Sequence, residues 1–207
     1  MARIIGRIIT PADTRWSYVT VFKPRLWRDK SERVRYSVRL IIPKESPVIQ
    51  EIKDAIQEVW NLDINNYYVP IEEMKNHPLH DGDIEKPYFN EYKNCYFINA
   101  ASESKPDIYD ENLNLITDPS EVYSGIYGKA CIQFESYKII DRYNSAHFAV
   151  GMRATLLALQ KLSALQKLSD GESLANATPK TFIPKTLDDY DRAEREFAMM
   201  QNRGLYL

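Results

Sequence analysis

The sequence predicts a mainly β domain with one long helix in its interior, from its composition and from two periodic patterns. Hydrophobic residues make up 44% and charged residues 27% of the 207 residues, which is typical of a folded globular protein and excludes a chain disordered throughout. Segments rich in β-branched and aromatic residues predict strands on both sides of a single stretch with helical spacing.

Two strands should precede the helix. The first covers 15–22 (RWSYVTVF), which is rich in β-branched and aromatic residues. The second covers 33–42, where apolar or aromatic residues occupy every even position. Because side chains alternate across a strand, one face should enter the core and the other should carry Arg33, Arg35 and Arg39.

The helix should begin just after Ser46 and Pro47, which suit a helix N-cap and a first turn. Apolar residues then recur at helical spacing from Val48 to Trp60, so this face should pack on the sheet. Residues 61–93 contain three prolines and predict a long irregular excursion. Such a connection usually serves a function or contains short elements of its own.

Several further elements should follow the excursion. The expected pieces are a buried strand over 94–100, a hairpin over 107–118, a long strand over 122–137 and a last strand over 146–151. In the long strand, Gly125 and Gly128 predict bends or a close approach of backbones. The apolar segment 154–168 is expected to be a helix, and it contains Ala-Leu-Gln-Lys-Leu-Ser twice in tandem, from position 158 to 169.

This order of elements is that of a five-stranded OB barrel, with long loops and with the helix between strands 3 and 4. We expect an OB-like domain over residues 1–174. Residues 175–207 contain two prolines and few apolar side chains. We therefore expect them to form a C-terminal extension, a flexible or partner-docking tail.

Basic residues are concentrated at the start of the chain. Residues 1–40 hold ten Lys or Arg and three acids, a charge of +7, whereas the rest of the chain carries −9. Such a segment is suited to an anionic partner, and cations interleaved with aromatic rings suit single-stranded nucleic acid, whose phosphates and unstacked bases they can contact. The residues that we expect to contact nucleic acid are Trp16, Arg25, Trp27, Arg28, Lys30, Arg33, Arg35, Arg39, Tyr92, Tyr123, Tyr127 and Lys129.

Two other functions are compatible with the sequence. Asp81, Asp83 and Glu85 stand at alternate positions, so their carboxylates could hold the divalent cation of a metal-dependent nuclease. The basic segment could instead bind an acidic protein, which would make the chain an interaction adaptor. The basic and aromatic mixture favours nucleic-acid binding over both.

No other chemistry is predicted. His77, His80, Cys95 and Cys131 lack the spacing of a zinc site, and no nucleophilic triad is recognisable. We therefore expect no catalytic residue, metal or cofactor. Two cysteines without a disulfide framework, no secretory signal and no apolar run of about 20 residues predict a protein of the cytoplasm rather than of a membrane.

Seven short segments carry a resemblance to a known family. They are 18–24, 36–44, 79–83, 92–100, 105–108, 118–128 and 165–172. In this order they resemble a family of bacteriophage single-stranded DNA-binding proteins. The resemblance implies an OB-type barrel that binds single-stranded DNA without catalysis during phage replication or recombination, in the cytoplasm of the infected host. Implied partners are single-stranded DNA, duplex DNA more weakly, phage or host replication and recombination proteins, and a second copy of the chain.

Overall fold

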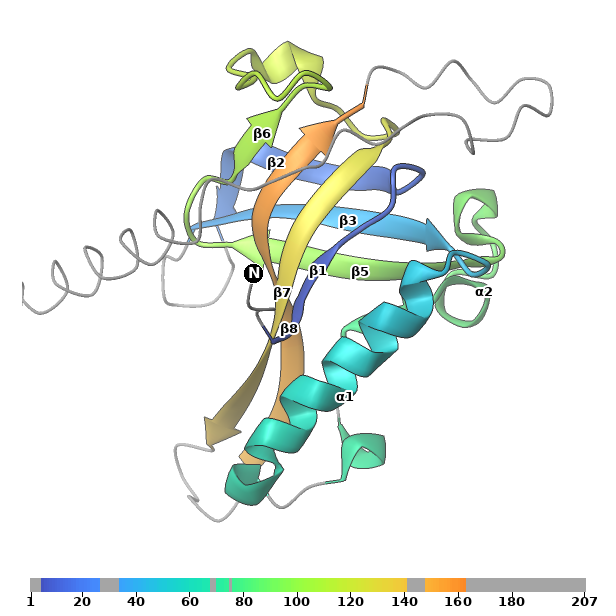
Figure 1. Ribbon diagram of the computed structural model, residues 1–207, viewed down its shortest axis with the longest axis vertical. Coiled ribbons are helices and arrows are strands. Elements are labelled where there is room, and N and C mark those ends of the chain that lie inside the picture. Colours follow the sequence, from blue (N-terminus) through green and yellow to red (C-terminus); the bar gives the residue numbers. More distant parts are fainter. Residues whose placement is uncertain (1–4, 27–33, 68–69, 75, 141–147, 163–207) are drawn as a thin grey trace, which may run out of the picture. The chain divides into compact units, whose positions relative to one another are not determined.

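The computed structural model describes residues 5–26, 34–67, 70–74, 76–140 and 148–162 (Figure 1). Its strands are β1 (Arg7–Ile9), β2 (Arg15–Leu26), β3 (Val34–Pro43), β4 (Leu79–Asp81), β5 (Cys95–Ser102), β6 (Asp107–Tyr109), β7 (Gly128–Ile140) and β8 (Phe148–Lys161). Its helices are α1 (Val48–Tyr67), α2 (Gly82–Glu85) and three short 3-10 turns, η1 (Ile71–Glu73), η2 (Asn90–Tyr92) and η3 (Pro119–Glu121). None of these helices is long and apolar enough to cross a membrane.

The strands form one sheet that curls into a barrel. Its order is β1-β7-β8-β5-β3-β2, in which β5 and β8 run parallel and the other neighbours antiparallel. The two ends of this order, β1 and β2, are consecutive parts of the chain. The segment that joins them stays beside β7, because the amides of Thr10 and Trp16 donate to the carbonyls of Ala130 and Ile126 at 2.9 Å.

The OB-type barrel that the sequence predicted is therefore present. Counting β1 and β2 as one bent strand, its five strands are β1/β2, β3, β5, β7 and β8. Helix α1 follows β3 and precedes β4, so in the five-stranded barrel it connects the second strand to the third and not, as expected, the third to the fourth, because β1 and β2 are two parts of one bent strand. The short strands β4 and β6 extend the sheet beside β5 and β8.

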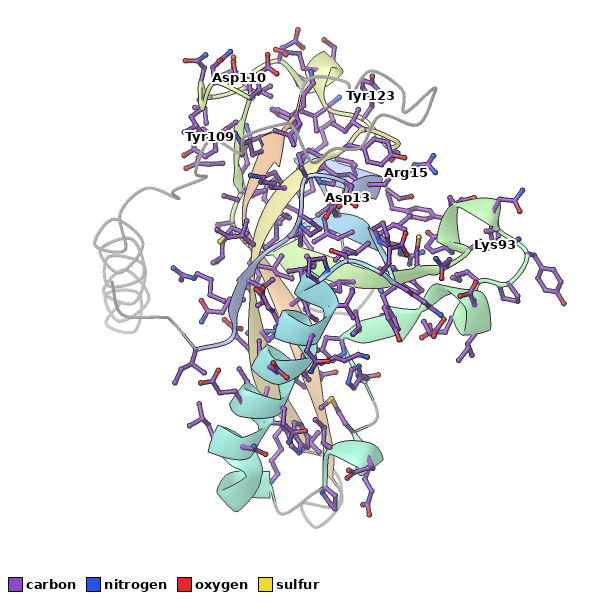
Figure 2. The ribbon with its side chains drawn as sticks, turned by 45° about the vertical axis from the view of Figure 1, so that its right-hand side comes forward. Asp13, Arg15, Lys93, Tyr109, Asp110 and Tyr123 are labelled. Atoms are coloured by element: carbon purple, nitrogen blue, oxygen red, sulfur yellow. The ribbon has the colours of Figure 1, made fainter. Side chains whose placement is uncertain are left out.

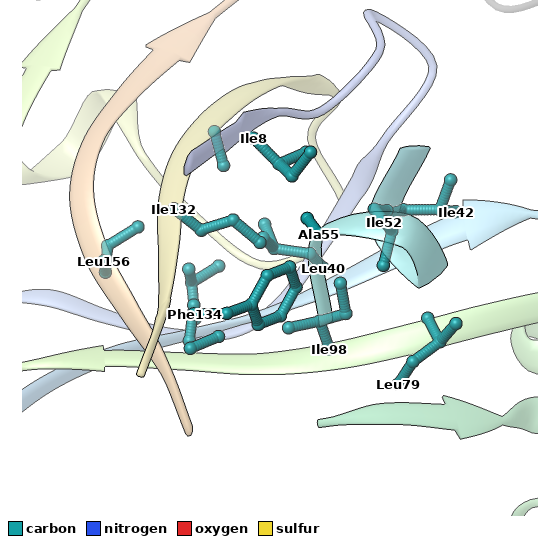
Figure 3. Packing of buried hydrophobic residues seen from close by; sticks show 14 of the residues in the cluster. Ile8, Leu40, Ile42, Ile52, Ala55, Leu79, Ile98, Ile132, Phe134 and Leu156 are labelled. Atoms are coloured by element: carbon teal, nitrogen blue, oxygen red, sulfur yellow. The ribbon is translucent and has the colours of Figure 1, made fainter. Parts of the chain in front are cut away.

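The helix packs its predicted apolar face on the barrel, against β1 and β7. The seven residues at helical spacing are all buried: Val48, Ile49, Ile52, Ala55, Ile56, Val59 and Trp60. Figure 3 shows Ile52 and Ala55 beside Leu40, Ile132 and Phe134, which the strands direct inward. The helix continues seven residues beyond the predicted end. The excursion that follows contains η1, β4, α2 and η2, so it has the short elements that its length suggested.

The helix predicted over 154–168 is wrong, because β8 continues through this segment as far as Lys161. Its buried positions alternate: Val150, Met152, Ala154 and Leu156 face the core, and after a register shift the next core residue is Leu159. This period of two is typical of a strand. It is hard to recognise in the sequence because both faces of this strand carry apolar residues. The first hexapeptide copy begins in β8, and the second lies outside the described residues.

The long strand begins at Gly128 rather than at position 122. Residues 122–127 form a loop, in which Gly125 has a φ of +107° that strongly favours glycine. At Gly128 a Cβ atom would lie 2.2 Å from the carbonyl oxygen of Gln160 and 2.7 Å from the ring of Trp16. The close backbone approach predicted for these glycines is therefore confirmed at Gly128.

Replacing Val38 by aspartate should unfold the protein. Val38 is 2% exposed on the inner face of β3, and an uncompensated buried charge costs about 3–5 kcal/mol. Ser37→Asp on the outer face is the matched control, and its loss of one hydroxyl contact with Thr20 (2.8 Å) should cost no more than about 1 kcal/mol. Urea denaturation of both variants measures the difference. Equal stabilities would contradict the inward orientation of Val38.

Candidate nucleic-acid interface

The outer face of β2, β3 and β5 carries the polar side chains of these strands. Strand pairing aligns Arg39 with Ser17 on β2 and with Asn99 on β5, while Leu40 and Ile98 point into the core. The arginine face predicted for residues 33–42 is thus the outside of the barrel. OB folds bind oligonucleotides on this face of their second and third strands and on the loops beside it.

Arg39 lies at the centre of a cluster on this face. Its guanidinium carbon is 4.8 Å from the ring centroid of Tyr18, 4.9 Å from that of Phe97 and 5.8 Å from that of Tyr92. Its Nε donates to Asn99 Oδ1 at 2.7 Å and its Nη1 donates to the Tyr92 hydroxyl at 3.0 Å. We call these five residues the Arg39 cluster. Two hydrogen bonds and three rings hold the guanidinium in one orientation.

Tyr18 reaches the cluster through an irregularity in β2. Between Ser17 and Thr20 the register advances three residues on β2 and two on β3, so β2 contains one extra residue. Tyr18 adopts a φ of +50°, which costs a side chain about 1–2 kcal/mol. Simple alternation would put Tyr18 inside with Trp16, but its side chain is 57% exposed. The bulge therefore presents an aromatic ring on the outer face.

Two aromatic residues expected to contact nucleic acid are buried instead. Trp16 is fully buried, where its Nε1 donates to the carbonyl of Gly128 at 3.3 Å, so its ring belongs to the core. Tyr92 is 2% exposed because its ring packs between Phe97 and Phe89. Neither ring has a free face for a base, which corrects both expectations. Tyr92 still contributes its hydroxyl to Arg39.

The other described candidates lie in two places. Arg35 is half-buried on the outer face of β3, two residues before Ser37. Tyr123, Tyr127 and Lys129 lie at the entrance to β7; Tyr127 pairs with Arg15, and Figure 2 shows Tyr123 near Arg15. Burial lowers the pKa of Lys129. The loop that holds Tyr123 lies beside β2 next to Tyr18, because the amide of Val19 donates to Ser124 Oγ at 3.2 Å.

The most basic part of the predicted site lies outside the described residues. This applies to Trp27, Arg28, Lys30 and Arg33, and to the side chain of Arg25. Arg25 lies near the end of β2, and the others belong to the connection between β2 and β3, which leaves the sheet at the register pair Leu26–Val34. OB folds use this connection, and the one between their last two strands, to bind oligonucleotides. Contacts from these residues stay predictions.

Three members of the Arg39 cluster, Tyr18, Phe97 and Asn99, are not among the residues predicted to contact nucleic acid. Phe97 and Asn99 stand at odd positions of the short strand predicted over 94–100, and the pairing of that strand with β3 aligns them with Ile41 and Arg39. Alternation within the strand was the available signal for both. The bulge at Tyr18 has no comparable signal, because a tyrosine is not typical of left-handed backbone.

The carboxylates considered for a metal site are engaged by Lys44 and His80 instead. Lys44 Nζ lies 2.7 and 2.8 Å from the two carboxylate oxygens of Asp81 and 2.7 Å from Asp83 Oδ2. Asp83 also accepts a hydrogen bond from the amide of Asn94 at 2.9 Å. Glu85 lies 2.8 Å from His80 Nδ1. We call the contacts of Lys44 with Asp81 and Asp83 the Lys44 clamp, since they tie the excursion to the end of β3.

These contacts shift the pKa values of the clamp. The hydrogen bond from Lys44, followed by that from the Asn94 amide, lowers the pKa of Asp83 below its ordinary value of 3.8. The hydrogen bonds to Asp81 and Asp83 raise the pKa of Lys44. In the part of the chain that the structure describes, no three His, Cys, Asp or Glu residues are grouped to hold a metal ion. The nuclease hypothesis therefore has no support.

The family model described as the ssDNA-binding protein of Enterobacter phage Enc34 matches residues 6–196. None of the curated proteins searched matches the chain.

Solved structures share the fold. A C-terminally truncated single-stranded DNA-binding protein from bacteriophage Enc34 is 24% identical, with 81% of this chain and 87% of that chain covered and a TM-score of 0.60. The same phage protein in complex with ssDNA is 21% identical over 82% and 89% of the chains, with a TM-score of 0.59. The single-stranded DNA-binding protein gp2.5 of bacteriophage T7 is 14% identical over 86% and 98%, with a TM-score of 0.54.

Removing the charge of Lys44 should loosen the excursion. In Lys44→Met, Asp83 loses the partner that most lowers its pKa, so the amide of Asn94 should exchange with deuterium faster at neutral pH. Lys53→Met is the control, because Lys53 shares with Lys44 a contact to the ring of Tyr96 (5.4 and 5.1 Å). Unchanged exchange in Lys44→Met would show that the clamp does not order this loop.

The same clamp should give the excursion an acid sensitivity. A carboxyl whose folded pKa is lowered stabilises the fold at pH above its ordinary value, here 3.8, and this contribution is lost as pH falls through the lowered pKa. Hydrogen exchange at 82–94 should therefore accelerate below about pH 4 relative to the barrel core. Lys44→Met should show less of this pH dependence. An equal dependence in both proteins would contradict the assignment to the clamp.

Proposed function

The chain belongs to the family of the Enterobacter phage Enc34 ssDNA-binding protein, and we propose from this that it binds single-stranded DNA around the Arg39 cluster. The observation that carries the proposal is the held guanidinium of Arg39 under the half-exposed ring of Tyr18, on the outer face of β3. A cation and an aromatic ring fixed side by side can receive one phosphate and one base of a single strand.

The contacts have separate roles in this proposal. A base stacks on the exposed face of Tyr18, which accepts any base because every base has a π face. Arg39 uses only two of its five N–H donors in the described contacts, so the others are available to a phosphate or a base edge. Recognition by stacking and charge predicts little sequence preference.

The basic residues of the connection between β2 and β3 complete the proposed surface. Arg28, Lys30 and Arg33 lie in this connection, and its two ends enter the sheet at Leu26 and Val34, beside the pair Arg25–Arg35. In our proposal they neutralise phosphates on either side of the stacked base. Residues 175–207 are proposed to serve contacts with other replication proteins or with a second copy of the chain.

We assign the protein no catalytic step. In this proposal the protein covers single-stranded DNA during replication or recombination of phage DNA in the host cytoplasm. It binds duplex DNA more weakly. The Lys44 clamp supports this reading, because it occupies the acidic residues that a metal-dependent nuclease would need. Single-stranded and duplex DNA should stay intact during incubation with magnesium or manganese. Cleavage that disappears in Asp81→Ala would overturn the assignment.

Tyr18→Gly should separate binding from folding. Glycine tolerates the φ of +50° at this position, so the variant should unfold at a temperature no lower than the wild type. Loss of one stacked ring should weaken binding to oligothymidylate by about 1–3 kcal/mol. Fluorescence anisotropy and thermal denaturation measure the two quantities. Full affinity in Tyr18→Gly would remove this residue from the interface.

Arg39→Lys should weaken binding although it keeps the charge. An ammonium group cannot reproduce the planar fork that contacts Asn99 and Tyr92 together. The control is Lys138→Ala, which removes an exposed cation near the far end of β7. Wild-type binding should also weaken with salt, with a log–log slope near −0.7 per neutralised phosphate. A wild-type protein whose binding is independent of salt, or absent, would overturn the proposed function.

A further inference from the structure

The part of the excursion that lies between β4 and β5 exposes large apolar side chains that the proposed interface does not use. Tyr88 is 94% exposed, Ile84 is 77% exposed and Phe89 is 50% exposed. All three lie within six residues of one another, around α2. Large aromatic rings are rarely left in water to this extent, and a contiguous group of exposed apolar side chains marks a contact surface.

The backbone that carries these rings is tightly held. The amide of Phe89 donates to the carbonyl of Lys86 at 3.1 Å, and the amide of Tyr92 donates to the carbonyl of Phe89 at 3.0 Å. A Cβ atom at Gly82 would lie 2.4 Å from the carbonyl oxygen of Tyr92, so α2 packs directly on η2. The Lys44 clamp fixes the start of the excursion. A ligand that met these rings would not have to order the loop first.

The exposed rings are continuous with the Arg39 cluster. The centroids of Phe89 and Tyr92 are 6.3 Å apart with an interplanar angle of 78°, and those of Tyr92 and Phe97 are 5.3 Å apart at 77°. Tyr92 accepts a hydrogen bond from Arg39. A line of contacting side chains therefore leads from Arg39 through the buried ring of Tyr92 to Phe89, and Tyr88 is the next residue along the chain.

The charges beside these rings suit a polyanion. Lys86 precedes the two aromatic residues and is half-exposed, and Lys93 follows them and is exposed. Figure 2 shows Lys93 on the part of the excursion that projects from the barrel. The nearby carboxylates of Asp81 and Asp83 face Lys44 rather than an incoming phosphate. Two exposed acids of this segment remain, Glu85, which lies 2.8 Å from His80 Nδ1, and Glu91.

We propose that Tyr88 and Phe89 form a second stacking site for the single strand that crosses the Arg39 cluster. Single-stranded DNA that leaves Tyr18 and Arg39 passes over the buried ring of Tyr92. Its next bases then stack on the exposed rings of Tyr88 and Phe89. Lys86 and Lys93 take phosphates there. This inference rests on the proposed function and extends the bound length of DNA. A docking site for another protein would not require rings continuous with Arg39 or two flanking lysines.

The test compares oligothymidylates of about 4 and about 16 nucleotides, the limits of the site sizes of OB folds. Tyr88→Ala should weaken binding of the long oligonucleotide by about fivefold or more, and Phe89→Ala should do the same. Tyr88→Phe keeps the ring and should bind as the wild type does. Ile84→Ala removes apolar surface from the same excursion without removing a ring, and it should change affinity by less than about twofold.

The outcomes separate this inference from the proposed function. If the wild type binds neither oligonucleotide, the proposed function fails. If Tyr18→Gly loses affinity while Tyr88→Ala and Phe89→Ala keep it, the Arg39 cluster stands and the second site is wrong. Equal losses in Tyr88→Ala and Ile84→Ala, or a loss in Tyr88→Phe, would exclude stacking. Unchanged DNA affinity with a lower sedimentation coefficient in Tyr88→Ala would assign these rings to self-association instead.

Discussion

Closure of the barrel by one bent strand is the constraint on which the rest of the structure depends. The first strand must pair with β3 along one part and with β7 along another, and Trp16 lies at the point where it changes partner. There the indole packs on Gly128, whose missing side chain leaves room for this ring and for the backbone of Gln160. Two residues later the chain bulges at Tyr18 and directs its ring over Arg39. The candidate interface is therefore built directly on the closure of the core.

Patterns that depend on a single element could be predicted from the sequence. The alternation of residues 33–42 placed Arg39 outside and Val38 inside, and helical spacing identified the buried residues of α1 between Val48 and Trp60. The predictions were wrong where a distant part of the chain determines whether a side chain is buried. Trp16 and Tyr92 have the chemistry of stacking residues, but barrel closure and the excursion cover their rings. The end of β8 was mistaken for a helix because apolar residues on both of its faces hide the period of two.

The acidic segment shows why residue type alone does not define a site. Asp81, Asp83 and Glu85 have the spacing of metal ligands along the chain. In the fold, Lys44 at the end of β3 and His80 in β4 take up their oxygens. The lysine is 37 residues away from Asp81 in sequence, so only the tertiary structure brings it there. The same carboxylates then order the excursion that carries Tyr88 and Phe89.

Pairing of the first strand with β7 also determines how the chain can fold. The contacts that close the barrel join residues 112 positions apart at Trp16 and Gly128, and 126 positions apart at Arg7 and Gln133. Contacts this distant in sequence slow folding, because a long loop must close before they can form. A ribosome must therefore release most of the domain before its first strand finds β7. Until then the aromatic and basic N-terminal segment lacks its partner strand. The protein is therefore most prone to aggregation during its synthesis.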